Sequence, residues 1–210
     1  MTPWELYLSA LRELQQGDRT TRCWEICFAA GAERRPIILQ HLILGINAHI
    51  NLDLGVAAAE VAPAGALPGL RRDFDRINEI LALLVGQVQR DIGALSPWIA
   101  LLDRVSGHHD ERMIKFSMEV ARTDAWRFGV ELAPLDRRDW GGPIGARDAS
   151  IARLGRVLLN PGFPLSAKLR LIGARESGDV RRNIEVLNRV AGPDLRTVDA
   201  RVKQERALGE

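Results

Sequence analysis

Five polar residues interrupt an otherwise apolar stretch of the sequence, HLILGINAHINLDL, at residues 41–54. Residues four apart on a helix share one slowly drifting stripe, and four residues have this spacing here: His41, Gly45, His49 and Asp53. Asn47 and Asn51 fall together on roughly the opposite side. The stretch has no ordinary charged face, so we expect it to be buried. Because a buried polar group without a partner costs about 1 to 3 kcal/mol, we expect these side chains to pair with one another or with a ligand.

A second aspartate occurs on the apolar side of a later helix, predicted at residues 110–132. The inner arc of that helix is defined by Met113, Phe116, Val120 and Phe128. Asp124 lies near the middle of this arc, where an aspartate is rarely left alone. Its candidate partners are Arg122, Arg127, a histidine or a metal ion. The segment GHHDE directly before the helix places His108 and His109 side by side.

Imidazoles and carboxylates from separate helices are a ligand set for a hard or borderline metal. The residues predicted to converge are His49, Asp53, His108, His109 and Asp124. One divalent ion (zinc, manganese or iron) would leave a bound water as nucleophile, and hydrolysis of an ester or phosphoester is its plainest use. Without a metal, His49 backed by Asp53 or Asp124 is a candidate general base. Three asparagines would then support the ligands or orient a small-molecule substrate: Asn47, Asn51 and Asn78.

A non-catalytic alternative stays open at this point. The same polar residues could form a closed hydrogen-bond network that fixes helix register in a module that binds an apolar ligand or a partner helix. Other enzyme classes lack their signatures, because the sequence has no G-x-S-x-G, no H-E-x-x-H, no P-loop and no G-x-G-x-x-G after a strand.

The elements that must position these residues are all helices, since apolar residues recur at three and four and no strand-type alternation persists. We predict helices at 3–16, 19–31, 36–60, 70–92, 96–106, 110–132, 147–158, 165–176, 179–190 and 194–207. The fold class is therefore all-α: one domain, residues 1–210, with about eight to ten helices around a buried central helix at 37–60. A close approach is expected at Gly45, a glycine inside that helix.

The longest predicted connection, residues 133–148, has two interpretations. It carries Gly-Gly-Pro and Trp140. It is either a lid over a site or an irregular connection whose tryptophan fills the core. The last helix, 194–207, is amphipathic, which allows a homodimer contact or a solvated end.

The charge distribution and the cysteine content argue against a nucleic-acid partner and against a thiolate metal site. The chain has 29 basic and 27 acidic residues, a net charge of +2, and the two signs alternate nearly everywhere along it. Nucleic-acid binding needs positive charge gathered on one face, so we expect no nucleic-acid partner. Cys23 and Cys27, four apart on one helix, are poorly placed for a disulfide and too few for a thiolate metal site, so we expect two buried apolar residues.

No charged leader precedes an apolar core at the N-terminus, so we do not expect secretion. The longest nearly uncharged run, Pro36 to Leu52, contains five polar residues that lipid would penalise. A buried helix in a cytoplasmic protein, with no membrane span, explains that run better.

Three motifs resemble an uncharacterised, mostly actinobacterial family, a domain of unknown function. They are GINAHINLDL at 45–54, DFDRIN at 73–78 and ARTDAW at 121–126. The resemblance spans roughly Pro36 to Leu132 and implies a bacterial protein without a known activity. It singles out Gly45, Asn47, His49, Asn51, Asp53, Asp73, Asn78, Arg122 and Trp126, and it leads us to expect substrate contacts from Arg122 and Trp126. Many relatives have a second histidine where this chain has Leu52.

Overall fold

The computed structural model describes residues 2–61, 66–67, 69–77 and 110–190, with the side chains of 110–118 and 186–190 excepted. Within these residues every regular element is a helix, which confirms the all-α fold class. The elements are α1 (Pro3–Gln16), α2 (Arg22–Gly31), α3 (Ile38–Ala48), a π turn (His49–Asp53), α4 (Leu54–Val61), α7 (Asp110–Leu132), a 3₁₀ turn (Arg137–Asp139), α8 (Gly141–Leu159), α9 (Leu165–Gly173) and α10 (Val180–Val190). Residues 69–77 are also helical.

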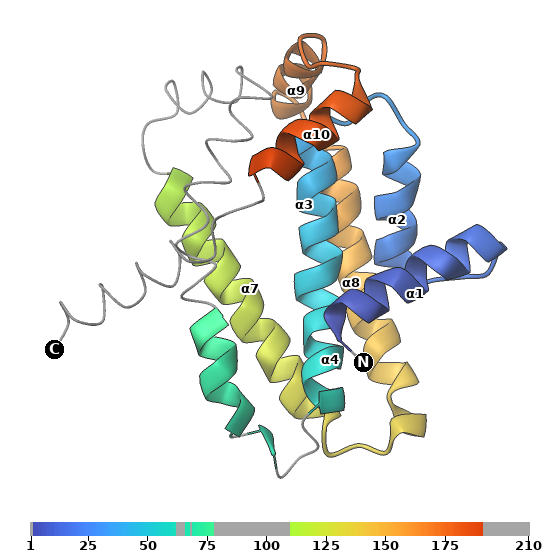
Figure 1. The fold of residues 1–210 in the computed structure, drawn as a ribbon, viewed down its shortest axis with the longest axis vertical. Helices are drawn as coiled ribbons and strands as arrows, with labels where there is room; N and C mark the ends of the chain where they lie inside the picture. The colour runs from blue at the N-terminus through green and yellow to red at the C-terminus, as the bar shows by residue number, and fades with distance from the viewer. Residues whose placement is uncertain (1, 62–65, 68, 78–109, 191–210) are drawn as a thin grey trace, which may run out of the picture.

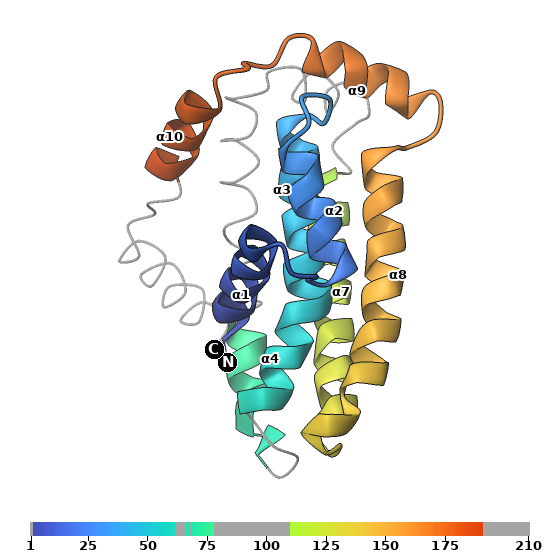
Figure 2. The ribbon, with the colours of Figure 1, turned by 90° about the vertical axis from the view of Figure 1, so that its right-hand side faces the viewer.

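The centre of the bundle is one continuous helix formed by α3, the π turn and α4. Figures 1 and 2 show it as a column with α7 on one side and α2 and α8 on the other, while α1 crosses it near the π turn. By length and a mean hydropathy of 1.4 it is long and apolar enough to cross a membrane, but 61% of that window is buried inside the structure. It therefore packs as the core helix that the sequence predicts.

The backbones of α4 and α7 cross closely at two glycines. A Cβ at Gly55 would lie 2.7 Å from the carbonyl oxygen of Ala125 and 2.9 Å from the ring of Phe128, and a Cβ at Gly129 would lie 3.0 Å from the carbonyl oxygen of Gly55. The close approach that we predicted at Gly45 was wrong within the described residues, since a Cβ there meets no described atom within 4 Å. The crossing lies further along the same helix, where α7 lies against it.

Side chains from one helix close the ends of others. Both carboxylate oxygens of Asp148 on α8 accept backbone N–H groups at the start of α2, from Arg22 and Cys23, each at 2.9 Å. Gln40 on α3 donates from Nε2 to the carbonyl oxygens of Leu158 and Leu159 at the end of α8, at 2.8 and 3.2 Å. Because unsatisfied helix ends are costly, these contacts fix how α2, α3 and α8 are aligned.

The predicted 133–148 connection is shorter than expected. Helix α8 begins at Gly141 rather than at 147, and Pro143 lies in its first turn, where a missing backbone N–H costs nothing. Trp140 is buried and donates its indole N–H to the carbonyl oxygen of Leu135 at 3.3 Å. The segment is the irregular connection with a core tryptophan rather than a lid.

Other predicted helix boundaries differ less from the observed ones, and some predicted helices lie outside the described residues. Helix α9 ends at Gly173 instead of 176, and α2 begins at Arg22 instead of 19. The helices predicted at 96–106 and 194–207, most of 70–92, and the residues Asn78, His108 and His109 lie outside the described residues.

Candidate functional site

A π turn divides the central helix at the residues that the sequence analysis singled out. The backbone N–H of Leu54 donates to the carbonyl oxygen of His49, five residues back, instead of the four of an α-helix. Single π turns are rare inside α-helices and are frequent at functional sites. The turn begins at His49 and ends at Asp53, so its local distortion falls on this pair.

His49 and Asp53 form a pair with very different exposures. The imidazole Nδ1 lies 3.7 Å from the carboxylate Oδ2, and the side chains are 42% and 6% exposed, respectively. That distance is within ion-pair range and longer than a hydrogen bond. The pair is thus a solvent-accessible imidazole in front of a buried carboxylate.

Trp24 on α2 completes the surroundings of Asp53. Its indole Nε1–H donates to the same carboxylate oxygen, Oδ2, at 3.1 Å. Burial raises the pKa of the Asp53 carboxyl above its usual value, while the His49 imidazole and the Trp24 hydrogen bond oppose that rise. The sequence analysis did not single out Trp24. A buried indole N–H usually has a hydrogen-bond acceptor, so a core tryptophan is a signal that an acceptor lies close to it.

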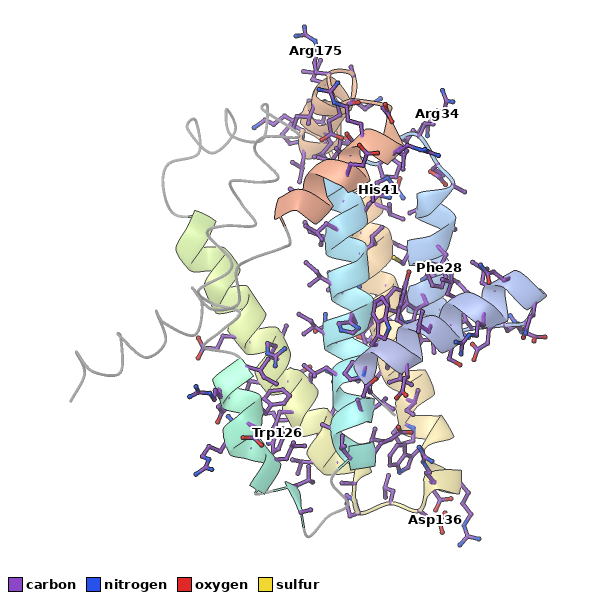
Figure 3. All side chains as sticks on the ribbon, viewed as in Figure 1. Phe28, Arg34, His41, Trp126, Asp136 and Arg175 are labelled. Carbon is purple, nitrogen blue, oxygen red and sulfur yellow. The ribbon has the colours of Figure 1, made fainter. Side chains whose placement is uncertain are left out.

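Aromatic rings hold Trp24 in place. Its ring stacks on Phe28 at a centroid distance of 5.3 Å, and Tyr7 of α1 packs against it at 5.1 Å. Figure 3 shows Phe28 where α1 and α2 meet beside the central helix. Such pairs contribute about 0.5 to 1.5 kcal/mol beyond their buried area, so the indole N–H is aimed at Asp53 by a fixed ring.

Asn47 and Asn51 lie on another side of the central helix and connect it to α8. Asn47 Nδ2 donates to the carbonyl oxygen of Ile151 at 3.1 Å, and Asn51 Nδ2 donates to Asn47 Oδ1 at 2.9 Å. Arg147 Nε of α8 donates to the carbonyl oxygen of Asn51 at 2.5 Å. These amides therefore hold α8 against the π turn, and their role in orienting a substrate stays a prediction.

Asp124 is not buried, and its partner comes from a different helix than expected. Its Oδ2 accepts from Arg147 Nη2 at 2.8 Å, and its side chain is 55% exposed. The predicted burial was wrong because the buried side of α7 is centred on Ala125, Phe128 and Leu132, and one residue turns a helix by about 100 degrees. Asp124 thus sits at the edge of that side, where α8 supplies the arginine.

The predicted metal ligands are only partly represented. Among the described side chains, no three histidine, cysteine or acidic residues come together in a way that could hold an ion. His49 and Asp53 are adjacent, Asp124 faces Arg147, and His108 and His109 are outside the described residues. Within this part of the chain, His49 is the side chain best placed to bind a metal, with Asp53 behind it as an orienting carboxylate.

Trp126 lies in a second core cluster with Phe74 and Leu67, and the buried side chain of Arg122 lies over the Phe74 ring. Trp126 packs against Phe74 at a ring distance of 4.9 Å, and Arg71 lies over its ring at 5.3 Å. The Arg122 guanidinium is 4.8 Å from the Phe74 ring, and burial lowers its pKa. Figure 3 labels Trp126 near the end of α7. Both side chains contribute to packing, and substrate contacts from them stay a prediction.

The two cysteines are free, as expected. Cys23 is buried, and burial raises the pKa of its thiol; Cys27 is half-buried, and burial raises the pKa of its thiol to about 11. Because the thiolate is the nucleophile, neither residue is activated for catalysis at neutral pH.

An open, polar depression of about 430 Å³ lies elsewhere on the described surface, around the start of α2. It is lined by Glu13, Arg19, Thr20, Thr21, Arg22, Glu25 and Asp148. Neither His49 nor Asp53 contributes to it, and both carboxylate oxygens of Asp148 already close the end of α2. The depression therefore supplies no group to the histidine–aspartate pair.

The chain was compared with family models, curated proteins and solved structures. Residues 5–161, from α1 to the end of α8, match the model of a family of unknown function (DUF5995). This confirms the expected resemblance to an uncharacterised family. No curated protein and no solved structure matches the chain. The matched region contains the π turn, Trp24 and Arg147, so the site lies within the part of the chain that defines the family.

Proposed function

This chain belongs to the DUF5995 family, whose function is unknown, and from the site we propose that it is an enzyme in which His49 and Asp53 act as an acid–base pair. One observation carries the proposal. A half-exposed imidazole stands 3.7 Å from a buried carboxylate, and that carboxylate is held by the indole N–H of Trp24.

The geometry suits proton transfer by the imidazole. With Nδ1 directed at Asp53, the carboxylate favours the tautomer that carries its proton on Nδ1 and leaves Nε2 as the base. The negative carboxylate also stabilises the imidazolium that forms when Nε2 takes a proton from water. Hydrolysis of an ester or phosphoester of a small molecule, in a bacterial cytoplasm, is the reaction class we assign to this pair.

A metal-dependent form of the same hydrolysis is the second candidate. A carboxylate behind a histidine is also how metal-binding imidazoles are oriented. His49 would then bind a divalent ion such as zinc, manganese or iron through Nε2. His108 and His109, outside the described residues, are the further ligands that the sequence offers.

The non-catalytic module remains the competing interpretation. The contacts of Asn47, Asn51 and Arg147 favour a structural role for that side of the helix, since they join it to α8. His49 differs from them because its imidazole is half-exposed and has only the Asp53 contact within the described part of the chain.

A substrate panel tests the proposal. The panel contains nitrophenyl esters and nitrophenyl phosphate mono- and diesters, and the proteins are the wild type, His49→Gln and the matched control His41→Gln on the same helix. We expect the wild type and His41→Gln to hydrolyse one class, and His49→Gln to lose about 10²- to 10⁴-fold in rate with its helical circular dichroism retained. Hydrolysis that His49→Gln retains, or no hydrolysis by the wild type, would contradict the proposal.

Chelation separates the two catalytic candidates. The acid–base pair alone predicts that the activity survives dialysis against EDTA. An activity that is lost on dialysis and restored by zinc or manganese would instead assign the metal-dependent form.

A further inference from the structure

The longest segment of the chain without acidic residues lies between Asp148 and Glu176. From Ala149 to Arg175 the sequence has five basic residues and no Asp or Glu: the basic ones are Arg153, Arg156, Lys168, Arg170 and Arg175. Elsewhere acids and arginines alternate, as in Asp136-Arg137-Arg138-Asp139. The second half of α8 and all of α9 therefore present positive charge that no neighbour in sequence balances.

The same segment exposes large apolar side chains. Their exposed fractions are Leu154 47%, Val157 58%, Phe163 86%, Leu165 47% and Leu171 73%. Phe163 has the highest of these values, and it lies in the loop between α8 and α9, bounded by Pro161 and Pro164.

The basic and apolar residues of this segment are exposed on both helices. On α8, Ile151, Ala152 and Gly155 face the core, whereas the outward residues are Arg153, Leu154, Arg156 and Val157. On α9, Ile172 is buried, and the exposed residues are Leu165, Lys168, Arg170 and Leu171. We call these eight residues together with Phe163 the α8–α9 surface.

The α8–α9 surface lies at one end of the bundle. Gln40 at the start of α3 holds the end of α8, and a Cβ at Gly173 of α9 would lie 3.3 Å from Ile37. Figures 1 and 2 show α9 across this end, beyond the end of α8. Figure 3 places Arg34 and Arg175 at the same end. The α2–α3 loop, with Glu33, Arg34 and Arg35, adds one net positive charge there, whereas Glu176 follows Arg175.

We infer that the α8–α9 surface docks on the face of a bilayer that contains anionic phospholipids. Cations interspersed with exposed apolar side chains are the pattern of a surface that lies in the headgroup region, where lysine and arginine pair with anionic lipids and apolar side chains enter the acyl boundary. Phe163 is the side chain placed to insert. The protein lies on the membrane and does not span it.

A bilayer fits this surface better than an acidic protein partner. Protein interfaces take their affinity from anchors that fill pockets on the partner. The apolar side chains at this end of the molecule extend outward over two helices and a loop. A deformable, negatively charged plane accommodates that arrangement without a complementary pocket.

Co-sedimentation of the full chain with vesicles tests the inference. The vesicles are phosphatidylcholine mixed with phosphatidylglycerol, and phosphatidylcholine alone as reference. We expect binding to the mixed vesicles, much weaker binding to phosphatidylcholine alone, and release from the mixed vesicles as sodium chloride rises and screens the charges. Equal binding to both vesicle types, or binding to neither, would overturn the inference.

Matched variants locate the contact. Lys168→Gln with Arg170→Gln should weaken the partition onto mixed vesicles by about fivefold for each charge removed, and Phe163→Ser should weaken it on its own. The controls are Arg138→Gln and Val61→Ser, a cation with an 80% exposed side chain and an apolar residue that is 64% exposed, both outside the α8–α9 surface. Control variants that lose as much binding, or a wild-type dimer in solution that Phe163→Ser dissociates, would assign the surface to something other than lipid.

Discussion

Trp24 donates its indole N–H to Asp53 Oδ2 at 3.1 Å, and this hydrogen bond joins α2 to the end of the π turn. The same oxygen lies 3.7 Å from His49 Nδ1. Asp53 is thus held between a buried donor and a half-exposed imidazole. A buried carboxylate needs such partners, because an isolated ionised group in a core is very costly.

Trp24→Phe should destabilise the fold more than the same change at another buried tryptophan. A hydrogen bond to a charged acceptor contributes about 1.5 to 3 kcal/mol, and one to a neutral acceptor about 0.5 to 1.5 kcal/mol. Trp140 donates to the neutral carbonyl oxygen of Leu135, so Trp140→Phe is the matched control. Urea unfolding near neutral pH measures the free energy of unfolding of both variants. An equal loss in the two would show that the hydrogen bond to Asp53 stabilises the fold no more than the hydrogen bond to a neutral carbonyl.

Asp53→Asn should change the pH dependence of stability. Burial raises the pKa of Asp53 in the folded state, so the folded protein binds this proton more tightly than the unfolded chain does. The resulting stability is fully present below the unfolded pKa and is lost as pH rises through the folded pKa. The unfolding free energy of the wild type should therefore fall, relative to that of Asp53→Asn, from acidic to neutral pH. A difference that grows with pH would indicate that partners outweigh burial.

Gly55→Ala and Gly45→Ala should have opposite effects, although both glycines lie in the central helix. A Cβ at Gly55 would lie 2.7 Å from the backbone oxygen of Ala125, whereas a Cβ at Gly45 meets no described atom within 4 Å. We expect Gly55→Ala to cost about 1 to 3 kcal/mol through overpacking and Gly45→Ala to gain up to about 1 kcal/mol of helix propensity. Thermal unfolding of both variants measures these changes in stability. A destabilised Gly45→Ala would show that another part of the chain does pack closely against position 45.

Helix content and several helix ends were predictable because they depend on local sequence. Helix α1 was predicted at 3–16 and observed at Pro3–Gln16. Thr2 caps its start, and Gly17, at φ +80°, ends it. Both are residues that act on their own neighbours, so no tertiary information was needed.

The π turn was not predictable from the pattern that revealed the helix. Apolar residues at three and four fit an unbroken α-helix through His49, and a single five-residue turn changes that pattern too little to detect. The sequence therefore singled out His49 and Asp53, but not the backbone distortion that they bracket.

Side-chain pairings between helices were also not predictable from the sequence, because they depend on how the helices pack together. The sequence pattern does not single out Arg147 or Trp24, and only packing brings them to Asn51 and Asp53. Asp124 was predicted to lie on the buried side of α7 because that side was taken to be wider than it is in the structure. The charge of a side chain and its place in the helical pattern limit its possible partners, but they do not determine which partner it contacts.

The most direct test of the account measures whether His49 and Asp53 act as one pair. The titration of the Asp53 carboxyl can be followed by carbon-13 NMR in the wild type, in His49→Gln and in His41→Gln. Because His49 lowers the pKa of Asp53 against the effect of burial, His49→Gln should raise the pKa of Asp53 further, and His41→Gln should leave it unchanged. An Asp53 titration that is the same in His49→Gln as in the wild type would contradict the acid–base pair.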